Sequence, residues 1–339
     1  MHISNGDVNI MIIIALIASF ISTFIVMPLI MKLMFKIGKV GIDVHKPNKP
    51  DVPEMCGLGM LIGLIVSTLI VLNINFDPKI LAFALTSIIA AVIGIIDDIK
   101  VLKAKVKTLL TILCFIPIVL MAVKYPNQII LGRPRAPLIG GFRLTILYWL
   151  LLPFAIAIPA NAVNMMDTYN GVMSGGCALI SISLLISSII LGQWSEAIMS
   201  AILLGITSAF YYYNKYPARA FSGDTGSLMI GAAIGSIVVL GRMEIIGITV
   251  LMPFIMNAFH SLRSIGGLLE RREIAERPVR VVGEYIEANL NPKAPKTLAN
   301  LILRKGRATE LELIRAYHSL CVISSIMGII TALLMMVRI

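Results

Sequence analysis

Long apolar runs restrict the fold of this chain more than any other feature. Hydrophobic residues make up 58% of its 339 residues and charged residues only 14%, which is far from the composition of soluble domains. Runs of about 20 apolar residues can cross the hydrocarbon core of a bilayer as helices. The sequence therefore predicts an all-α polytopic membrane protein, with residues 1–339 forming a single integral membrane domain.

Ten membrane-spanning helices are predicted from these runs. The predicted spans are 8–34, 55–73, 80–97, 107–123, 145–160, 172–192, 196–213, 226–241, 244–263 and 316–337. The first run is too long for the hydrophobic part of a signal peptide and has no basic segment before it. We therefore expect it to be the first span and not a cleaved leader.

Lysine and arginine predict which side of the membrane each loop faces. If the amino terminus is outside, the inside loops are 35–54, 98–106, 161–171, 214–225 and 264–315. These loops and their flanks carry 21 Lys and Arg residues, whereas the outside segments carry 7. Cytoplasmic loops are enriched in these residues. We therefore predict a multi-pass protein of the cell membrane with both termini outside.

Charge and cysteine content exclude two other classes of site. A net charge of +11 in so apolar a chain reflects the positive-inside bias and the binding of phosphates or anionic headgroups, not nucleic acid. The four cysteines are scattered in or near apolar segments, without the C-x-x-C spacing of a metal site. We expect them to be buried thiols.

Two connections between spans are long. The outside segment 124–144 has turn residues around short apolar runs, which predicts a small β-hairpin. In the inside segment 264–315, residues 279–286 are typical of a strand, and residues 297–303 of a short interfacial helix or a strand. This segment has too few apolar residues for a core of its own, so we expect it to pack on the membrane domain.

Three polar groups interrupt the apolar chain at the inner ends of predicted spans. They are Asp97-Asp98, the series Asn161, Asn164, Asp167 and Asn170, and the segment Phe221-Ser-Gly-Asp224-Thr-Gly-Ser227. Carboxylates and amides at a membrane boundary are costly unless they are used. Their oxygens, next to basic loops, favour Mg²⁺ and a phosphorylated substrate.

Each polar group also has a structural alternative. Adjacent residues on a helix point about 100° apart. One of Asp97 and Asp98 can therefore face a ligand, while the other orients a lysine or caps a neighbouring helix. The lysines that follow fit a positive-inside signal, or one of them neutralises a phosphate. Asp224 either binds metal or phosphate, or caps the helix after it.

The asparagine series recurs every three residues. On an α-helix only Asn161, Asn164 and Thr168 share a face, whereas a 3₁₀ turn would align all four polar residues. Pro159, just before the series, fits a broken helix entry. Amides that only cap a helix are the alternative. One Asp and one Asn, completed by substrate phosphates, is the ligand set that we expect for Mg²⁺.

The three motifs in this order resemble the polyprenyl-phosphate N-acetylhexosamine-1-phosphate transferases. The loop Gly38-Lys-Val-Gly-Ile-Asp43-Val-His-Lys-Pro47 and the segment 297–303 look closest to the archaeal and eukaryotic dolichyl-phosphate branch. The resemblance implies transfer of N-acetylhexosamine-1-phosphate, with N-acetylglucosamine the expected sugar, from a UDP-sugar to polyprenyl or dolichyl phosphate. This would be the first membrane step of glycan assembly. It also implies Mg²⁺, or Mn²⁺ in its place, and a cytoplasmic site; a homodimer is left open.

The resemblance also implies roles for individual residues. Asp224 and Asn164 would bind the metal, and Asp97, Asp98 and Lys107 would be catalytic on the lipid-phosphate side. The remaining expected substrate contacts are Phe221, stacked on uracil; Asn170 and the backbone around Tyr169, at the uracil edge; and Asn161 and Asp167.

The chain departs from the family pattern in two places. Bacterial members continue with Asp-Gly-x-Asp-Gly, but this chain has Asp167-Thr-Tyr-Asn170-Gly171, which excludes a second Asp there as a base. The last inside loop lacks both Pro-Arg-His-Arg and a His-rich motif, and residues 270–280 are the nearest equivalent. Arginine suits a diphosphate, so Arg277 and Arg280 are the predicted contacts.

Two other functions compete with this reading. Polar residues within a membrane also occur in transporters of anionic substrates, although those residues usually lie in mid-span and often come with an internal repeat. An inactive homologue that binds lipid phosphate is the second alternative. The motifs here lie at helix ends, and the sequence shows no strong repeat.

Overall fold

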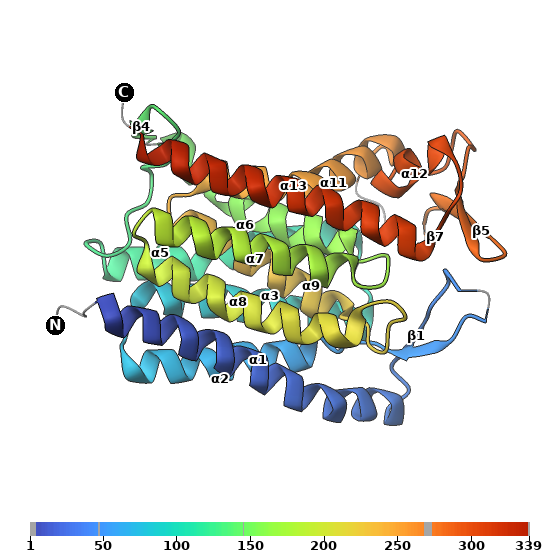
Figure 1. The fold of residues 1–339 in the computed structure, drawn as a ribbon, viewed down its shortest axis with the longest axis horizontal. Coiled ribbons are helices and arrows are strands. Elements are labelled where there is room, and N and C mark those ends of the chain that lie inside the picture. Colours follow the sequence, from blue (N-terminus) through green and yellow to red (C-terminus); the bar gives the residue numbers. More distant parts are fainter. Residues whose placement is uncertain (1–4, 47, 145, 268–272, 338–339) are drawn as a thin grey trace.

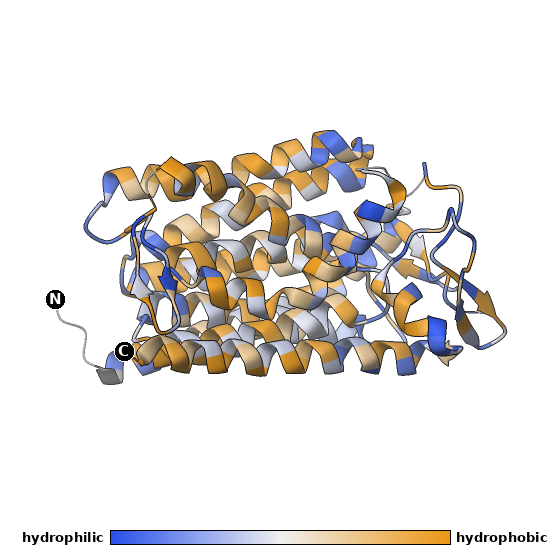
Figure 2. Ribbon diagram, turned by 90° about the horizontal axis from the view of Figure 1, so that it is seen from above, coloured by the Kyte–Doolittle hydropathy of each residue, from blue (hydrophilic) through white to orange (hydrophobic). Residues whose placement is uncertain are grey.

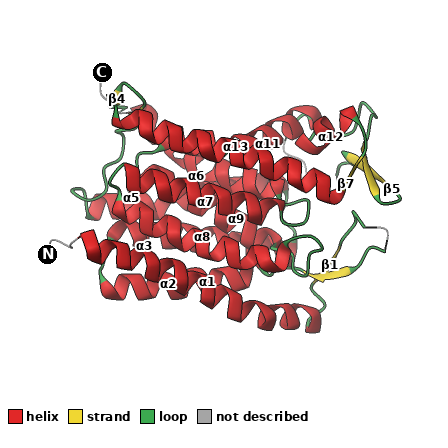
Figure 3. Ribbon diagram, viewed as in Figure 1, coloured by secondary structure: helices red, strands yellow, loops and turns green. Residues whose placement is uncertain are grey.

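The computed structural model describes residues 5–46, 48–144, 146–267 and 273–337, most of them in helices that run side by side along the long axis of the molecule (Figures 1 and 3). The helices are α1 Asn5–Lys36, α2 Gly57–Ile74, α3 Pro78–Lys100, α4 Ala104–Ile112, η1 Leu113–Phe115, α5 Ile116–Lys124, α6 Ile146–Met166, α7 Val172–Ile190, α8 Trp194–Asn214, α9 Gly223–Leu240, α10 Glu244–Val250, α11 Met252–Ile265, α12 Leu298–Ile302, η2 Leu303–Lys305 and α13 Glu310–Met336.

Within the described residues, nine helical segments are long and apolar enough to cross a membrane, which confirms the polytopic fold. One of them, residues 104–124, is made of α4, η1 and α5. A tenth span is formed if α10 and α11 count together, but they are bent by 69° at the break between them. Pro253 in the first turn of α11 cannot continue the hydrogen bonding of α10. Hydrophilic residues gather toward the two ends of the bundle (Figure 2).

The two ends of the bundle carry different loops. α1 begins and α13 ends at the same end, as an even number of crossings requires (Figure 1). The hairpin of β3 (Arg135–Ala136) and β4 (Gly140–Gly141) also lies at that end, and Leu138 N–H there donates to Leu334 O at 3.4 Å. This confirms the hairpin predicted for 124–144. The remaining strands lie at the opposite end, which we call the site end.

Two small antiparallel sheets mark the site end. One pairs β1 (Val40–Ile42) with β2 (Asp51–Pro53), and the other has the order β5 (Val279–Val282), β6 (Tyr285–Ala288), β7 (Ala308–Thr309). The single strand predicted over 279–286 is therefore wrong. Gly283, at φ +61°, makes the turn that divides it into a hairpin.

The soluble segment between α11 and α13 packs on the membrane domain, as predicted. α12 is the short helix expected within 297–303. Asn257 on α11 accepts from Leu298 N–H at 3.0 Å and donates to Met165 O on α6 at 3.0 Å. One buried amide thus joins the soluble segment to two spans.

Two predicted span boundaries are wrong. The last helix begins at Glu310 and not at 316, because Thr309 and Glu312 form a capping box there. The fifth helix continues to Met166 through Pro159, so Pro159 does not break it. The alternative of a 3₁₀ turn for the asparagine series is wrong for the same reason: Asn161 and Asn164 lie on a continuous α-helix.

Helix α9 is the centre of the bundle, and all its residues from Thr225 to Leu240 are buried. Small residues let its neighbours approach closely. A Cβ atom on Gly231 would lie 2.4 Å from Pro159 O on α6, and one on Gly94 of α3 would lie 2.4 Å from Asp224 O. The backbones of α3 and α9 therefore touch just where both helices carry their polar motifs.

We expect Gly94→Ala to destabilise the protein, because its methyl group would push α3 away from the first turn of α9. Overpacking of this kind costs about 1–3 kcal/mol, which thermal unfolding in detergent would register as a lower Tm. Val92→Ile adds one carbon to the same helix at a side chain that is 45% exposed, and it should leave Tm unchanged. Equal Tm values for the two variants would mean that α3 and α9 are not in close contact at Gly94.

Candidate functional site

The first turn of α9 brings the three polar motifs together. The Asp224 carboxylate accepts from Lys107 Nζ at 2.6 Å and from Asn164 Nδ2 at 2.6 Å. Lys107 Nζ also donates to Asp97 Oδ2 at 2.9 Å. Residues from α3, α4, α6 and α9 thus meet in one group, which we call the acidic centre: Asp97, Lys107, Asn164 and Asp224.

Asp97 and Asp98 point to different partners, as the helix geometry requires. Asp97 accepts from Lys107 and from Leu102 N–H, the latter at 2.5 Å. Asp98 accepts from the N–H groups of Asp224 and Thr225 at 2.8 and 3.0 Å, and from Thr225 Oγ1 at 2.6 Å. Asp98 therefore caps α9, so the geometry gives it a positioning role; its predicted catalytic role stays a prediction.

This cap is supplied from another helix. Ser222, the residue before α9, makes no side-chain cap of its own. A carboxylate at a helix N-terminus is favoured by the free N–H groups and by the helix dipole. Lys39 Nζ donates to Asp98 O at 3.1 Å. This carbonyl lies near the C-terminus of α3, where the helix dipole favours a cation.

The acidic centre has more negative than positive charge. Lys107 contacts two carboxylates, so the formal charge of Asp97, Asp224 and Lys107 together is negative. All three side chains are largely buried, where water screens charge poorly. Carboxylate oxygens of Asp97 and Asp224 meet at Lys107 Nζ, and the Asn164 amide lies next to Asp224. Carboxylate and amide oxygens are the ligands that a hard divalent cation prefers.

The two asparagines of α6 do different things. The Asn164 amide contacts Asp224 and also donates to Ser227 Oγ at 2.9 Å. The Asn161 amide donates to Thr111 Oγ1 at 2.9 Å and to Ala157 O at 2.8 Å. The amide N–H groups of Asn161 thus link α6 to α4, and its predicted contact with substrate stays a prediction.

Asp167 follows α6 and connects it to the start of α9. Its carboxylate accepts a hydrogen bond from Ser222 Oγ. Dense protein surrounds the carboxylate, and this burial, opposed by the Ser222 hydrogen bond and reinforced by the charges of Glu54 and Asp98, raises its pKa to about 6. The predicted substrate residue is thus also part of the scaffold.

Phe221 is held by the loop between α1 and α2. Its N–H donates to Pro53 O at 2.9 Å, and its carbonyl accepts from Cys56 N–H at 3.0 Å. The ring is half-buried, and no aromatic ring among the described residues stacks on it. It can therefore offer a face to a planar ligand.

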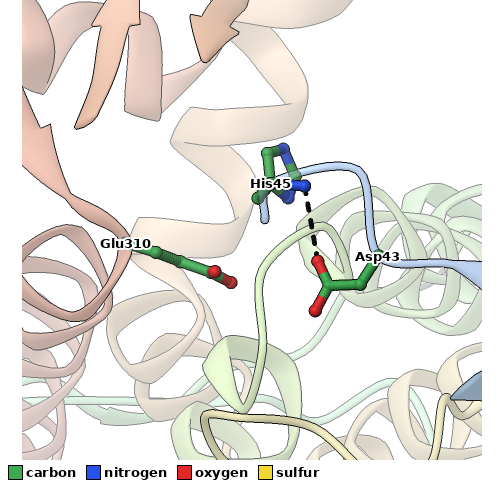
Figure 4. A group of neighbouring side chains, drawn as sticks. All are labelled: Asp43, His45 and Glu310. Atoms are coloured by element: carbon green, nitrogen blue, oxygen red, sulfur yellow. Dashed lines mark hydrogen bonds between the residues drawn. The ribbon is translucent and has the colours of Figure 1, made fainter. Parts of the chain in front are cut away.

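Asn170 leads to a second buried polar group that the sequence analysis missed. Its Nδ2 donates to Asp43 at 2.9 Å, and its N–H donates to Glu310 at 3.4 Å. Asp43 and Glu310 lie far apart in the sequence, next to His45 in space (Figure 4). The only sequence signal was an acidic residue three positions before Lys46 in a basic loop.

Asp43, His45 and Glu310 offer ligand atoms within 4.8 Å of one another. However, Lys46 Nζ bonds to Asp43 and lies 3.6 Å from Glu310 Oε2. We therefore assign Lys46, and no metal, as the cation of this group. Burial alone would raise the pKa of Asp43, but hydrogen bonds from Lys46 and Asn170 outweigh it and hold that pKa below its ordinary value.

The two predicted arginines lie in the soluble segment between α11 and α13. Arg277 and Arg280 are exposed, and Arg280 is on β5 of the soluble segment. Among the described residues neither guanidinium has a hydrogen bond or an ion pair; the carbonyl of Arg277 accepts from Asn289. Residues 270–272, the first three of the predicted motif, lie outside the described residues. A diphosphate contact by these arginines stays a prediction.

The cap on α9 can be tested through stability. Asp98→Ala leaves three donors without an acceptor, which costs about 1–3 kcal/mol for each buried group, so we expect a clearly lower Tm. Asp98→Asn keeps one acceptor oxygen and should lose less. Glu284→Ala, which removes an exposed carboxylate in the β5–β6 turn, is the control. An Asp98→Ala protein that melts with the wild type would rule out the capping role.

The raised pKa of Asp167 predicts a pH dependence. The folded state binds this proton more tightly than the unfolded state, so the group lowers stability as pH rises from its ordinary value of 3.8 to about 6. Asp167→Asn keeps an oxygen for Ser222 and cannot ionise. We expect its Tm to exceed that of the wild type at about pH 7–8, and the difference to vanish near pH 4. A difference that does not vary with pH would contradict the assignment.

A known protein family matches the part of the chain that contains the acidic centre. Residues 80–242 match the family described as glycosyl transferase family 4. A Saccharolobus solfataricus protein, provisionally named UDP-N-acetylglucosamine–dolichyl-phosphate N-acetylglucosaminephosphotransferase, is 31% identical over 66% of this chain and 70% of its own length. A Methanocaldococcus jannaschii protein, provisionally named a glycosyltransferase, is 30% identical over 87% of this chain and 89% of its own length.

A bacterial relative has similar identity over a shorter region. The phospho-N-acetylmuramoyl-pentapeptide-transferase of Acetivibrio thermocellus is 31% identical over 58% of this chain and 62% of its own length. The family match includes all four residues of the acidic centre as well as Asp98, whereas Asp43 and Glu310 lie outside it. The chain therefore belongs to glycosyl transferase family 4, among the polyprenyl-phosphate N-acetylhexosamine-1-phosphate transferases.

Proposed function

We propose that this protein transfers N-acetylglucosamine-1-phosphate from UDP-N-acetylglucosamine to dolichyl or another polyprenyl phosphate and releases UMP. The observation that carries the proposal is the acidic centre at one end of a membrane-spanning bundle. The names of two similar archaeal proteins support both the nucleotide sugar and the lipid acceptor. Neither family membership nor the position of the polar residues favours a transporter.

The acidic centre fits a divalent cation. Its excess negative charge and its carboxylate and amide oxygens suit Mg²⁺, with Mn²⁺ as a second candidate. Asp224 and Asn164, which touch each other at 2.6 Å, would hold the ion. When bound, the ion would neutralise charge on the diphosphate of the nucleotide sugar.

The protein residues position and neutralise the reacting phosphates. Lys107 is held at the boundary of the bundle by Asp97, from where its ammonium group can meet a phosphate. Asp98 fixes the first turn of α9 and, with it, Asp224. The half-buried ring of Phe221 would stack on the uracil base. Phosphoryl transfer depends mainly on such positioning and charge stabilisation.

The proposed step needs no general base. An oxygen of the lipid phosphate attacks the β-phosphorus of the UDP-sugar and forms the new P–O bond. The bond from that phosphorus to the bridging oxygen breaks, and UMP leaves with the electron pair. The lipid phosphate is already anionic near neutral pH, so no residue has to remove a proton from it. In this proposal Asp97 holds Lys107 in place, and Asp98 holds the first turn of α9.

We place the site end in the cytoplasm and the protein in the cell membrane. The predicted inside segments carry 21 basic residues and the outside segments carry 7, and this excess supports the orientation. A nucleotide sugar would then reach the acidic centre from the cytoplasm, and the lipid phosphate would reach it from the inner leaflet. The product would be a lipid-diphosphate sugar, the first membrane intermediate of glycan assembly.

The proposal predicts metal-dependent transfer that requires Asp224. Purified protein, dolichyl phosphate and radiolabelled UDP-N-acetylglucosamine should give labelled lipid and UMP; chelation should abolish this, and Mg²⁺ should restore it. Asp224→Ala should lower transfer by about a hundredfold or more, whereas Asp51→Ala, an exposed carboxylate on β2, should not. Ample transfer by a folded Asp224→Ala protein would overturn the metal assignment, and no transfer by the wild type with any UDP-sugar would overturn the function.

A further inference from the structure

A buried ionic group joins two distant parts of the chain at the site end. Lys46 Nζ bonds to Asp43 in the loop between β1 and β2, and it lies 3.6 Å from Glu310 Oε2 at the start of α13. We call Asp43, Lys46 and Glu310 the Lys46 clasp. It ties the first inner loop to the last membrane helix, which follows the soluble segment. Figure 4 shows its two carboxylates, Asp43 and Glu310.

The clasp holds the turn formed by residues 169–171. Asn170 donates through its side chain to Asp43 and through its backbone to Glu310. The Tyr169 ring stacks on His45 with ring centroids 4.5 Å apart. Both carboxylates of the clasp therefore accept hydrogen bonds from Asn170. Asp43 accepts from its side chain, and Glu310 accepts from its backbone N–H.

One ammonium group balances two buried carboxylates. The side chains of Asp43 and Glu310 are only 3% and 5% exposed. Lys46 Nζ bonds to Asp43 and lies 3.6 Å from Glu310 Oε2, and His45 is the other basic side chain next to the two carboxylates. Glu310 Oε2 has no hydrogen-bond partner in the described part of the chain, so Lys46 is its counter-ion. Without Lys46 two like charges would be left buried side by side, which is strongly unfavourable.

The same loop also positions Phe221. β2 follows Lys46 by a few residues, and Pro53 at its end accepts the Phe221 N–H at 2.9 Å. A Cβ atom on Gly41 of β1 would lie 3.1 Å from the Phe221 ring. The first inner loop is thus in contact with Phe221 on one side and with the Asn170 turn on the other.

We propose that the Lys46 clasp positions the two elements that enclose the nucleotide base, and so sets the affinity for the uridine nucleotide without acting on the transferred phosphate. This inference rests on the proposed function, in which Phe221 stacks on the base, and on the predicted contact of Asn170 with the uracil edge. The clasp has no hydrogen bond or ion pair with Asp97, Lys107 or Asp224 in the described residues. Contacts made equally in the ground state and the transition state change KM and leave kcat unchanged.

The test is a comparison of kinetic constants in Lys46→Met. We expect KM for UDP-N-acetylglucosamine to rise about tenfold, with kcat and KM for dolichyl phosphate within about twofold of the wild type. Lys49→Met, the same change at an exposed lysine of the same loop, should behave as the wild type. Unchanged KM for the nucleotide sugar, or a fall confined to kcat, would overturn the proposal.

A second variant separates positioning from a general loss of structure. Adding Glu310→Gln to Lys46→Met removes one of the two uncompensated charges while keeping an oxygen for Asn170 N–H. KM should then move back toward the wild-type value. If Lys46→Met does not fold, Asp43→Asn, which weakens the ion pair and keeps the shape, should raise KM for the nucleotide sugar in the same selective way. No rise in that variant, or no recovery in the double variant, would contradict the clasp.

Direct nucleotide binding keeps this test independent of the transferase assay. Calorimetry with UMP should show weaker binding to Lys46→Met than to wild type and Lys49→Met. Weaker UMP binding together with an inactive wild type would overturn the proposed reaction but support the clasp. An active wild type with equal UMP affinity in all three proteins would overturn the clasp and leave the reaction standing.

Discussion

The contact between Asp98 and the first turn of α9 is the interaction on which the rest of this structure depends. It gives a half-buried carboxylate three hydrogen-bond donors and gives a helix N-terminus the acceptor that its own sequence lacks. Each group would be costly alone at a membrane boundary. Because they satisfy each other, α3 and α9 are locked at their polar ends, and Asp97 and Asp224 are brought to the same lysine.

Close backbone packing makes this contact available. Gly94 leaves no room for a side chain between α3 and α9, and small residues along α9 admit α6 as well. In a membrane, where lipid tails compete equally for apolar side chains, such close approach is a main source of helix association. The residues that stabilise the bundle are thus next to those that form the acidic centre, so scaffold and site share one set of helices.

Two separate polar groups lie at the site end. The acidic centre lies within the bundle and suits the reacting phosphates, whereas the Lys46 clasp lies among the loops and holds the Asn170 turn. The family match covers the first group and stops short of both sequence segments that build the second.

The sequence by itself determined the membrane fold, most of the spans, and the three motifs that meet, because apolar run length and isolated carboxylates are local signals. It did not determine that Asp98 caps α9, that Asn161 bonds to Thr111, that residues 279–286 form a hairpin, or that Asp43 and Glu310 meet at Lys46. Tertiary structure decided these points, because a carboxylate or amide has the same local pattern whether it binds a ligand or a distant helix, and only the packed bundle supplies the partner.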